Sequence, residues 1–164
     1  METILFDIRG NLQPSIRIDL SLQEIEQFFV SPFDLTSKRH ELFREYKRYT
    51  LDLRSLLGRS FYQWVDGSFI SNGFNPNDID LVSFIDHNSY DEKETLIDQR
   101  FSKWSVSQHY VGVDAFTVWT YPVEHKQSAI FQADCAYWQD LFEHTRYNRN
   151  RKRFKKGFIQ VNIE

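Results

Sequence analysis

The spacing of apolar residues along the chain predicts alternating strands and helices. Leu42, Tyr46, Tyr49 and Leu53 recur at steps of three and four, which is the period of one helix face. Short apolar runs bounded by turn-forming residues are instead typical of strands. The predicted helices cover residues 21–30, 37–57, 91–103 and 127–147, and the predicted strands cover residues 2–8, 61–66, 79–85, 111–121 and 157–163.

Local end signals support two of these helices. Ser21 followed by Glu24 matches a capping box, which satisfies the free backbone N–H groups at a helix start. Gly58 follows the helix over residues 37–57 as a C-terminal cap. The polar face of that helix is strongly basic, and we expect its cations to be solvated partners of neighbouring acids. These cations are Lys38, Arg39, Arg44, Lys47, Arg48 and Arg54.

The order of the elements predicts a single α/β (α+β) domain spanning residues 1–164. Its core is expected to be a small mixed β-sheet with helices mainly on one face. The strand over residues 79–85 is apolar on both faces, as expected for a central strand. Hydrophobic residues make up 41% of the 164 residues and aromatic residues 16%, which is enough to build a core without disulfides.

Composition also restricts the compartment. No run of about 18 apolar residues occurs, so we expect no membrane-spanning helix. The N-terminus lacks the basic start and apolar stretch of a signal peptide. Cys135 is the lone cysteine, which excludes an intramolecular disulfide and a cysteine zinc cage. A cytoplasmic protein is therefore the expectation.

Two acidic residues beside a small-residue pair are the strongest chemical signal. Asp78 and Asp80 are two apart at the start of a predicted strand, so their carboxylates point to one face. Such a pair is costly to hold together unless a cation neutralises it, and hard divalent cations prefer oxygen ligands. Gly67 and Ser68 precede it across a polar loop and would let phosphates approach the backbone closely. Asp66, just before this pair, is left without a role.

This arrangement resembles the nucleotidyltransferase fold shared by DNA polymerase β, kanamycin nucleotidyltransferase and the minimal nucleotidyltransferases. Their pattern is Gly-Ser or Gly-Gly, a loop of about ten residues, and Asp-x-Asp on the next strand. The resemblance covers roughly residues 60–120 and implies that Asp78 and Asp80 bind Mg²⁺ or Mn²⁺. It also implies that Gly67 and Ser68 cradle the phosphates of a nucleotide such as ATP. Asp114, on a later predicted strand, is the natural third carboxylate of the catalytic and metal-binding set.

The chain departs from the family pattern in its loop. Many minimal members carry an arginine before the loop glycine, whereas Asn72 precedes Gly73 here. Positive charge for the phosphates must therefore come from elsewhere. Lys126, Arg100 and the basic segment near the C-terminus are the candidates. Phe69 and Phe74 are the loop aromatics that could stack on a base.

The basic segment over residues 146–156 contains seven cations and no acid. The whole chain has a net charge of −3, so the remaining residues sum to −10. A basic stripe on an acidic body indicates either a polyanionic partner or a solvated segment. The candidate polyanion-binding residues are Arg146, Arg149, Arg151, Lys152, Arg153, Lys155 and Lys156.

The flanks carry a second resemblance. Residues 7–14 and 155–159, together with the central motif, look like a small bacterial and phage group of nucleotidyltransferase-like proteins. Some minimal nucleotidyltransferases act in toxin–antitoxin or phage-defence pairs, so a cognate toxin or antitoxin is an implied partner.

The predicted function is metal-dependent transfer of a nucleoside monophosphate from a nucleoside triphosphate to a hydroxyl on a protein or RNA. Two alternatives stay open. One is a catalytically silent fold of the same kind that serves as an antitoxin or a nucleic-acid-binding module. The other is a transferase for a small molecule, which would need a partner subunit to complete its acceptor pocket. No membrane partner is expected.

Overall fold

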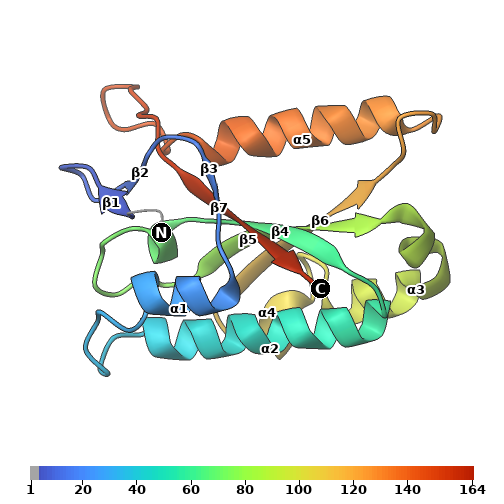
Figure 1. The fold of residues 1–164 in the computed structure, drawn as a ribbon, viewed down its shortest axis with the longest axis horizontal. Helices are drawn as coiled ribbons and strands as arrows, with labels where there is room; N and C mark the ends of the chain where they lie inside the picture. The colour runs from blue at the N-terminus through green and yellow to red at the C-terminus, as the bar shows by residue number, and fades with distance from the viewer. Residues whose placement is uncertain (1–3) are drawn as a thin grey trace.

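The computed structural model describes residues 4–164, and these residues build one mixed sheet flanked by helices (Figure 1). The predicted strand over residues 2–8 is reduced to β1 (Leu5–Phe6), and residues 2 and 3 lie outside the described part. A separate two-stranded sheet pairs β1 with β2 (Leu12–Gln13). The main sheet has the order β3 (Arg17–Asp19), β7 (Phe158–Ile163), β4 (Phe61–Asp66), β5 (Ile79–Asp86) and β6 (Val113–Thr120).

The sheet is mixed because its central strands alternate in direction. Strand β4 runs antiparallel to both of its neighbours, β7 and β5. The outer pairs β3–β7 and β5–β6 are parallel. The parallel β5–β6 connection needs a crossover, which α3 (His87–Arg100) and α4 (Val106–His109) provide. The predicted α/β domain with a small mixed sheet is confirmed.

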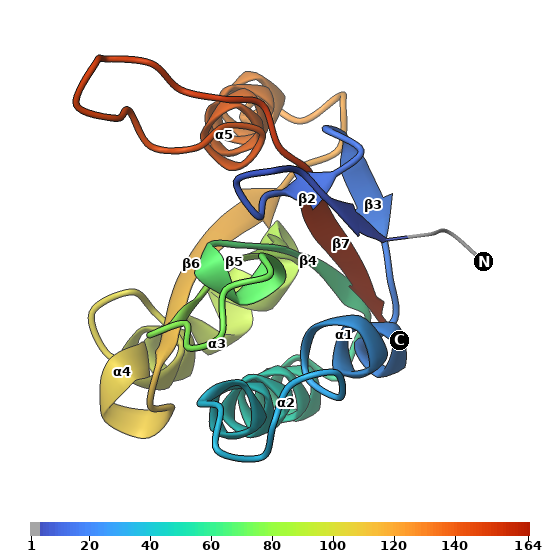
Figure 2. The same cartoon turned by 90° about the vertical axis from the view of Figure 1, so that its left-hand side faces the viewer.

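Helices cover both faces of the sheet, unequally. Helices α1 (Leu22–Phe29) and α2 (Arg39–Leu57) lie on one face together with α4, whereas α5 (Ser128–Phe142) lies on the other face (Figure 1 and Figure 2). A short 3₁₀ helix, η1 (Ser68–Ile70), follows β4. The face under α5 is the less completely covered of the two, because Phe142 alone is buried among the residues of α5.

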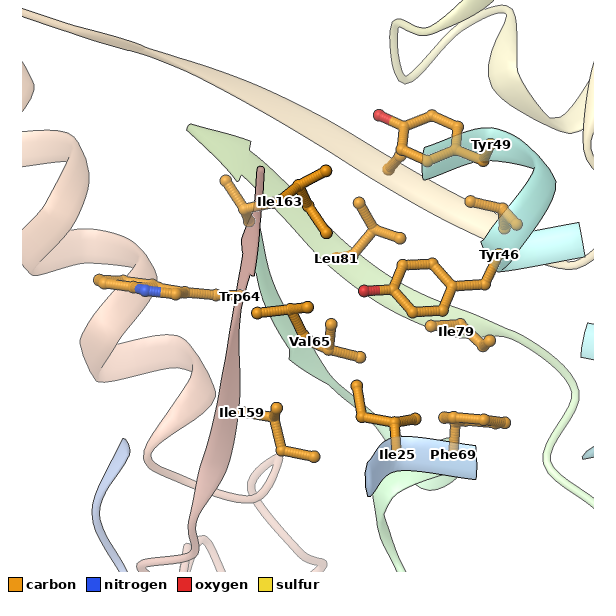
Figure 3. Packing of buried hydrophobic residues seen from close by; sticks show 14 of the residues in the cluster. Ile25, Tyr46, Tyr49, Trp64, Val65, Phe69, Ile79, Leu81, Ile159 and Ile163 are labelled. Atoms are coloured by element: carbon orange, nitrogen blue, oxygen red, sulfur yellow. The ribbon is translucent and has the colours of Figure 1, made fainter. Parts of the chain in front are cut away.

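The core lies mainly between the sheet and α2. Tyr46 and Tyr49 of α2 are fully buried and point toward Leu81 of β5, while Trp64 of β4 points to the opposite side (Figure 3). Side chains alternate between the faces of a strand, so the tyrosines and Leu81 share one layer and Trp64 belongs to the α5 layer. Each fully buried large apolar side chain contributes roughly 1.5–3 kcal/mol of transfer free energy.

The two helix caps predicted from the sequence are present in the structure. The Glu24 backbone N–H donates to the Ser21 hydroxyl at 3.2 Å, and the Ser21 backbone N–H donates to the Glu24 carboxylate at 2.8 Å. Gly58 caps α2 in the left-handed conformation, with φ of 69°. These two predictions are confirmed.

Two predicted boundaries are wrong. The helix expected over residues 127–147 ends at Phe142, and residues 144–155 instead form a hairpin held by a bridge between His144 and Lys155. Helix α3 begins at His87, where a turn was expected, because the Asp86 side chain accepts a hydrogen bond from the Asn88 backbone and caps the helix. Within residues 4–164, no helix combines the length and the apolar character needed to cross a membrane.

Candidate active site

Three acidic residues lie side by side on the neighbouring strands β4, β5 and β6. Asp66 pairs in register with Asp80, and Asp80 pairs in register with Asp114. Cross-strand partners project from the same face, with Cα atoms about 4.5–5.5 Å apart in sheets of this kind. That face is the one covered by α5. Strand pairing therefore brings together acids that are 14 and 34 residues apart in the sequence.

Asp78 extends this row by one further carboxylate. It precedes β5 by one residue, and both it and Asp80 line a cavity of about 540 Å³ at the edge of the α5 face. Burial raises the pKa of Asp80 to about 6, and the carboxylates of Asp78, Asp66 and Asp114 add to the increase. Two of the residues predicted from the sequence thus share a cavity, and the third lies in register beside Asp80.

Glycine is required at position 67 because the Asp80 side chain lies directly against it. Gly67 has φ of 84°, a conformation that residues with side chains rarely adopt. A Cβ atom there would also collide with Oδ2 of Asp80. Ser68 then begins η1, and both residues line the 540 Å³ cavity. The predicted small-residue pair therefore sits in contact with the predicted acidic pair.

Arg39 organises the loop that follows Gly67, and the expectation that it is solvated is wrong. Its side chain is fully buried. The guanidinium donates to the carbonyl of Gly73 at 3.0 Å, of Ser71 at 2.8 Å and of Ser68 at 3.3 Å. It also donates to the carbonyls of Phe69 and, at 3.0 Å, Phe29.

Among residues 4–164, no carboxylate forms an ion pair with this buried cation, and burial lowers the pKa of Arg39 to about 10. The planar guanidinium of Arg39 therefore fixes the path of the loop over residues 68–73. Helical periodicity placed Arg39 on the polar face, and no local signal marked its burial. Phe69 is itself fully buried in the core, so it cannot stack on a base, whereas Phe74 is half exposed.

Asp66 and Lys156 form a buried ion pair at the floor of the cavity. The Lys156 ammonium donates to the Asp66 carboxylate and, at 2.9 Å, to the carbonyl of Phe142. Both side chains are about nine-tenths buried. Burial raises the pKa of Asp66, and the ammonium of Lys156 partly offsets the increase. No local sequence signal indicated this pair, because its members are 90 residues apart.

Asp114 also has a lysine partner. The Lys103 ammonium donates to the Asp114 carboxylate and lies 4.7 Å from the centre of the Phe116 ring. Both members of the pair are about one-third exposed. Lys103 was not among the predicted cations, and it reaches Asp114 from the segment between α3 and α4.

The predicted basic segment divides into two groups. Arg153 forms a two-pronged ion pair with Asp140, with both N–O distances 2.8 Å, and Lys156 is buried against Asp66. The other five cations are exposed on the hairpin: Arg146, Arg149, Arg151, Lys152 and Lys155. Arg153 and Lys156 are therefore engaged in ion pairs with this chain's own acids, while the five exposed cations remain available to a partner.

The cations of the cavity differ partly from those expected. Arg146 and Lys156 line it, as does Arg9 of the β1–β2 turn, which sequence reasoning missed. Arg100 instead pairs with Asp52 at 2.6 Å on the α2 side. Lys126 is exposed before the start of α5 and does not line the cavity.

The acidic row offers carboxylate oxygens, which are the ligands that hard divalent cations prefer. The side chains are not already arranged as a set of metal ligands. Among residues 4–164, no three His, Cys, Asp or Glu side chains are grouped so that they could hold a metal ion. Asp66 and Asp114 have lysine partners instead. Metal binding would therefore require Lys103 to release Asp114.

Comparison with known protein families matches residues 4–162 to a family of unknown function, DUF6932. The chain belongs to this family. Because the match extends over nearly the whole chain, the DUF6932 domain includes the acidic row, the Gly67–Ser68 turn and the basic hairpin. No curated protein and no solved structure gives a match.

Proposed function

We propose that this DUF6932 protein is a metal-dependent nucleotidyltransferase that moves a nucleoside monophosphate from a nucleoside triphosphate to a hydroxyl on a macromolecule. The supporting observation is the convergence of Asp78 and Asp80 with the Gly67–Ser68 turn around one cavity lined by Arg9, Arg146 and Lys156. Cationic side chains offset triphosphate charge. The acidic side chains would hold the divalent cation that neutralises charge at the reacting phosphoryl group.

In the proposed reaction, the acceptor hydroxyl oxygen attacks the α-phosphorus. A new oxygen–phosphorus bond forms, the bond from the α-phosphorus to the bridging oxygen breaks, and pyrophosphate leaves with the electron pair. The hydroxyl proton passes to the Asp114 carboxylate. Mg²⁺ or Mn²⁺ held by Asp78, Asp80 and Asp114 would supply charge neutralisation and acidify the hydroxyl. Gly67 and Ser68 position the phosphates, and Arg146 and Lys156 contribute positive charge beside them.

A second function is favoured by a different observation. Lys103 and Lys156 neutralise two of the four carboxylates internally, which is what a catalytically silent binding module would retain. In that case the exposed hairpin cations, and not the acidic row, carry the activity. A role in a toxin–antitoxin or phage-defence pair is compatible with either function.

Label transfer separates the two functions. The protein is incubated with each nucleoside triphosphate labelled on the α-phosphate, with Mg²⁺ or Mn²⁺, and with host lysate or total RNA. We expect label on a discrete macromolecule, and we expect it to be lost in Asp78→Asn/Asp80→Asn. In a parallel incubation with triphosphates labelled on the γ-phosphate, transfer of that label would indicate a kinase instead. A folded protein that transfers no label from any triphosphate would favour the silent module.

A further inference from the structure

A second cavity adjoins the first and has a different chemical character. It encloses about 450 Å³ between β6 and α5, with Asp80 and Asp114 on one side. Its walls are apolar and aromatic: Phe116, Tyr137, Trp138, Leu141 and Phe142. The volume is in the range of small-ligand sites, which combine aromatic walls with a few polar groups.

The aromatic walls form one connected group of rings. The Trp138 ring centre lies 4.7 Å from that of Phe116, 5.2 Å from that of Tyr137 and 5.6 Å from that of Phe142. Tyr137 is nevertheless 61% exposed, so most of its surface is free to contact a ligand. A planar aromatic group would therefore fit this cavity well.

The polar side of the cavity is formed by Asp80, Asp114 and Arg146. Its two carboxylates accept hydrogen bonds from hydroxyl donors. Asp80 and Asp114 lie in register on adjacent strands, so they present carboxylate oxygens side by side, one oxygen of Asp114 being engaged by Lys103. A ribose at the 3′ end of RNA presents two neighbouring hydroxyls beside a planar base, which matches both the acceptors and the aromatic walls.

The two cavities meet at shared residues. Asp80, Leu141, Phe142 and Arg146 line both of them. A hydroxyl bound beside Asp114 in the aromatic cavity would therefore adjoin a nucleotide bound in the cationic cavity. Neighbouring cavities of this kind suit a donor and an acceptor that react with each other.

The exposed hairpin carries the positive charge that would bind a phosphate backbone. Residues 144–155 protrude beyond α5 as the orange-red loop in Figure 2 and carry the five exposed cations. Tyr147, 66% exposed, lies among them. Basic side chains interleaved with aromatic rings are typical of single-stranded nucleic-acid binding. An acidic protein would match the cations but would lack the two neighbouring ribose hydroxyls that suit Asp80 and Asp114.

We propose that the acceptor is the 3′ end of single-stranded RNA, with its terminal base in the aromatic cavity and its preceding phosphates along the hairpin over residues 144–155. This assignment rests on the proposed nucleotidyl transfer for its role as an acceptor, but the binding itself does not require catalysis. It also gives a function to the aromatic face of α5, which the fold leaves partly uncovered.

The test measures RNA binding without nucleotide or metal, by fluorescence anisotropy. The probe is a labelled single-stranded RNA of about 12 nucleotides, which is within the usual site size. A circular RNA of the same sequence, which has no 3′ end, is the matched ligand. We expect the linear RNA to bind about tenfold more tightly than the circle, because a stacked terminal base contributes that much. Equal affinity for the two would overturn the proposal.

Two variants locate the site. Tyr137→Ala should weaken linear RNA about tenfold and leave the circle unchanged. Arg149→Gln/Lys152→Gln should weaken both ligands and reduce the slope of log affinity against log salt by about 1.4, since each phosphate contact to a single strand contributes about 0.7. The control Arg44→Gln/Lys126→Gln removes two exposed charges elsewhere and should change neither quantity. RNA binding that none of the site variants alters would refute the assignment.

Two further arms separate this proposal from its alternatives. Single-stranded DNA of the same sequence should bind more weakly, because it lacks the 2′-hydroxyl, and equal or tighter binding would exclude RNA as the acceptor class. Label transfer to a protein, with no binding of linear RNA, would overturn the acceptor while the transferase stands. End-specific RNA binding with no transfer from any triphosphate would support the RNA site and refute the transferase.

Discussion

Replacing Arg39 tests whether one buried guanidinium fixes the loop beside the acidic pair. Arg39→Lys keeps the charge and most of the length but changes the geometry of the donors. The guanidinium contacts five main-chain carbonyls, on Phe29, Ser68, Phe69, Ser71 and Gly73. An ammonium has three N–H donors, so at least two of these carbonyls lose their partner.

The structure gives the expected size of the effect. A buried polar group left without a partner costs about 1–3 kcal/mol, so two of them cost about 2–6 kcal/mol. A domain of this kind has a total stability of about 5–15 kcal/mol, so the change is a large fraction of it. Arg44→Lys, on the same helix but exposed, is the matched control and should stay within about 0.5 kcal/mol of the wild type.

The assay is urea unfolding followed by circular dichroism, combined with nucleotide binding by calorimetry. We expect the midpoint to fall for Arg39→Lys alone, and nucleotide affinity to fall further than the population of unfolded protein explains. The second readout separates a disordered loop from general destabilisation. If Arg39→Lys and Arg44→Lys had the same midpoint, the carbonyl-anchoring argument would be wrong.

Three further predictions concern the carboxylate row. The pKa of Asp80 is about 6 in the folded protein and near 4 when unfolded, so the contribution of Asp80 to stability should decrease as pH rises from about 4 to 6. In urea titrations, Asp80→Asn should therefore be more stable than the wild type by about 1–3 kcal/mol at pH 7.5 but not at pH 4. Gly67→Ala should cost about 2 kcal/mol or more and abolish nucleotide binding, because the added Cβ collides with Asp80, and an unchanged melting midpoint would contradict this geometry. Lys156→Met should cost about 3–5 kcal/mol by leaving Asp66 buried without its partner, and Lys156→Met/Asp66→Asn should recover most of the loss in a double-mutant cycle.

Local sequence signals predicted the elements whose stability is decided locally. The strand over residues 61–66 is found with those bounds, and the strand predicted to end at residue 85 continues to Asp86. The capping box at Ser21 and the glycine cap at Gly58 depend on contacts within four residues, so the sequence alone was sufficient.

Features that depend on long-range packing were beyond the sequence signals. Arg39 occupies a polar position in the helical pattern, and its burial follows from the carbonyls of a loop about 30 residues away. The end of α5 at Phe142 reflects the hairpin that follows, in which the Thr145 backbone N–H donates to the carbonyl of Phe154 at 2.9 Å. Helix periodicity carries no information about such a partner.

Only part of the candidate site was predictable from the sequence. Asp78, Asp80 and Asp114 were chosen from spacing and resemblance, and strand pairing brings Asp80 and Asp114 into register. Register is set by the whole sheet, so the sequence could not show that Asp66 joins the same row. The two ion pairs were missed for the same reason, because Lys103 and Lys156 approach Asp114 and Asp66 from separate segments, although Lys156 itself was predicted as a polyanion-binding residue.

Crystals grown with Mn²⁺ and a non-hydrolysable triphosphate analogue would test the central claim most directly, by anomalous scattering. The account predicts a Mn²⁺ peak about 2.0–2.3 Å from carboxylate oxygens of Asp78 and Asp80, with the phosphates along Gly67 and Ser68. It also predicts that Lys103 has released Asp114. A nucleotide bound away from this cavity, or Mn²⁺ bound without Asp78 and Asp80, would contradict it.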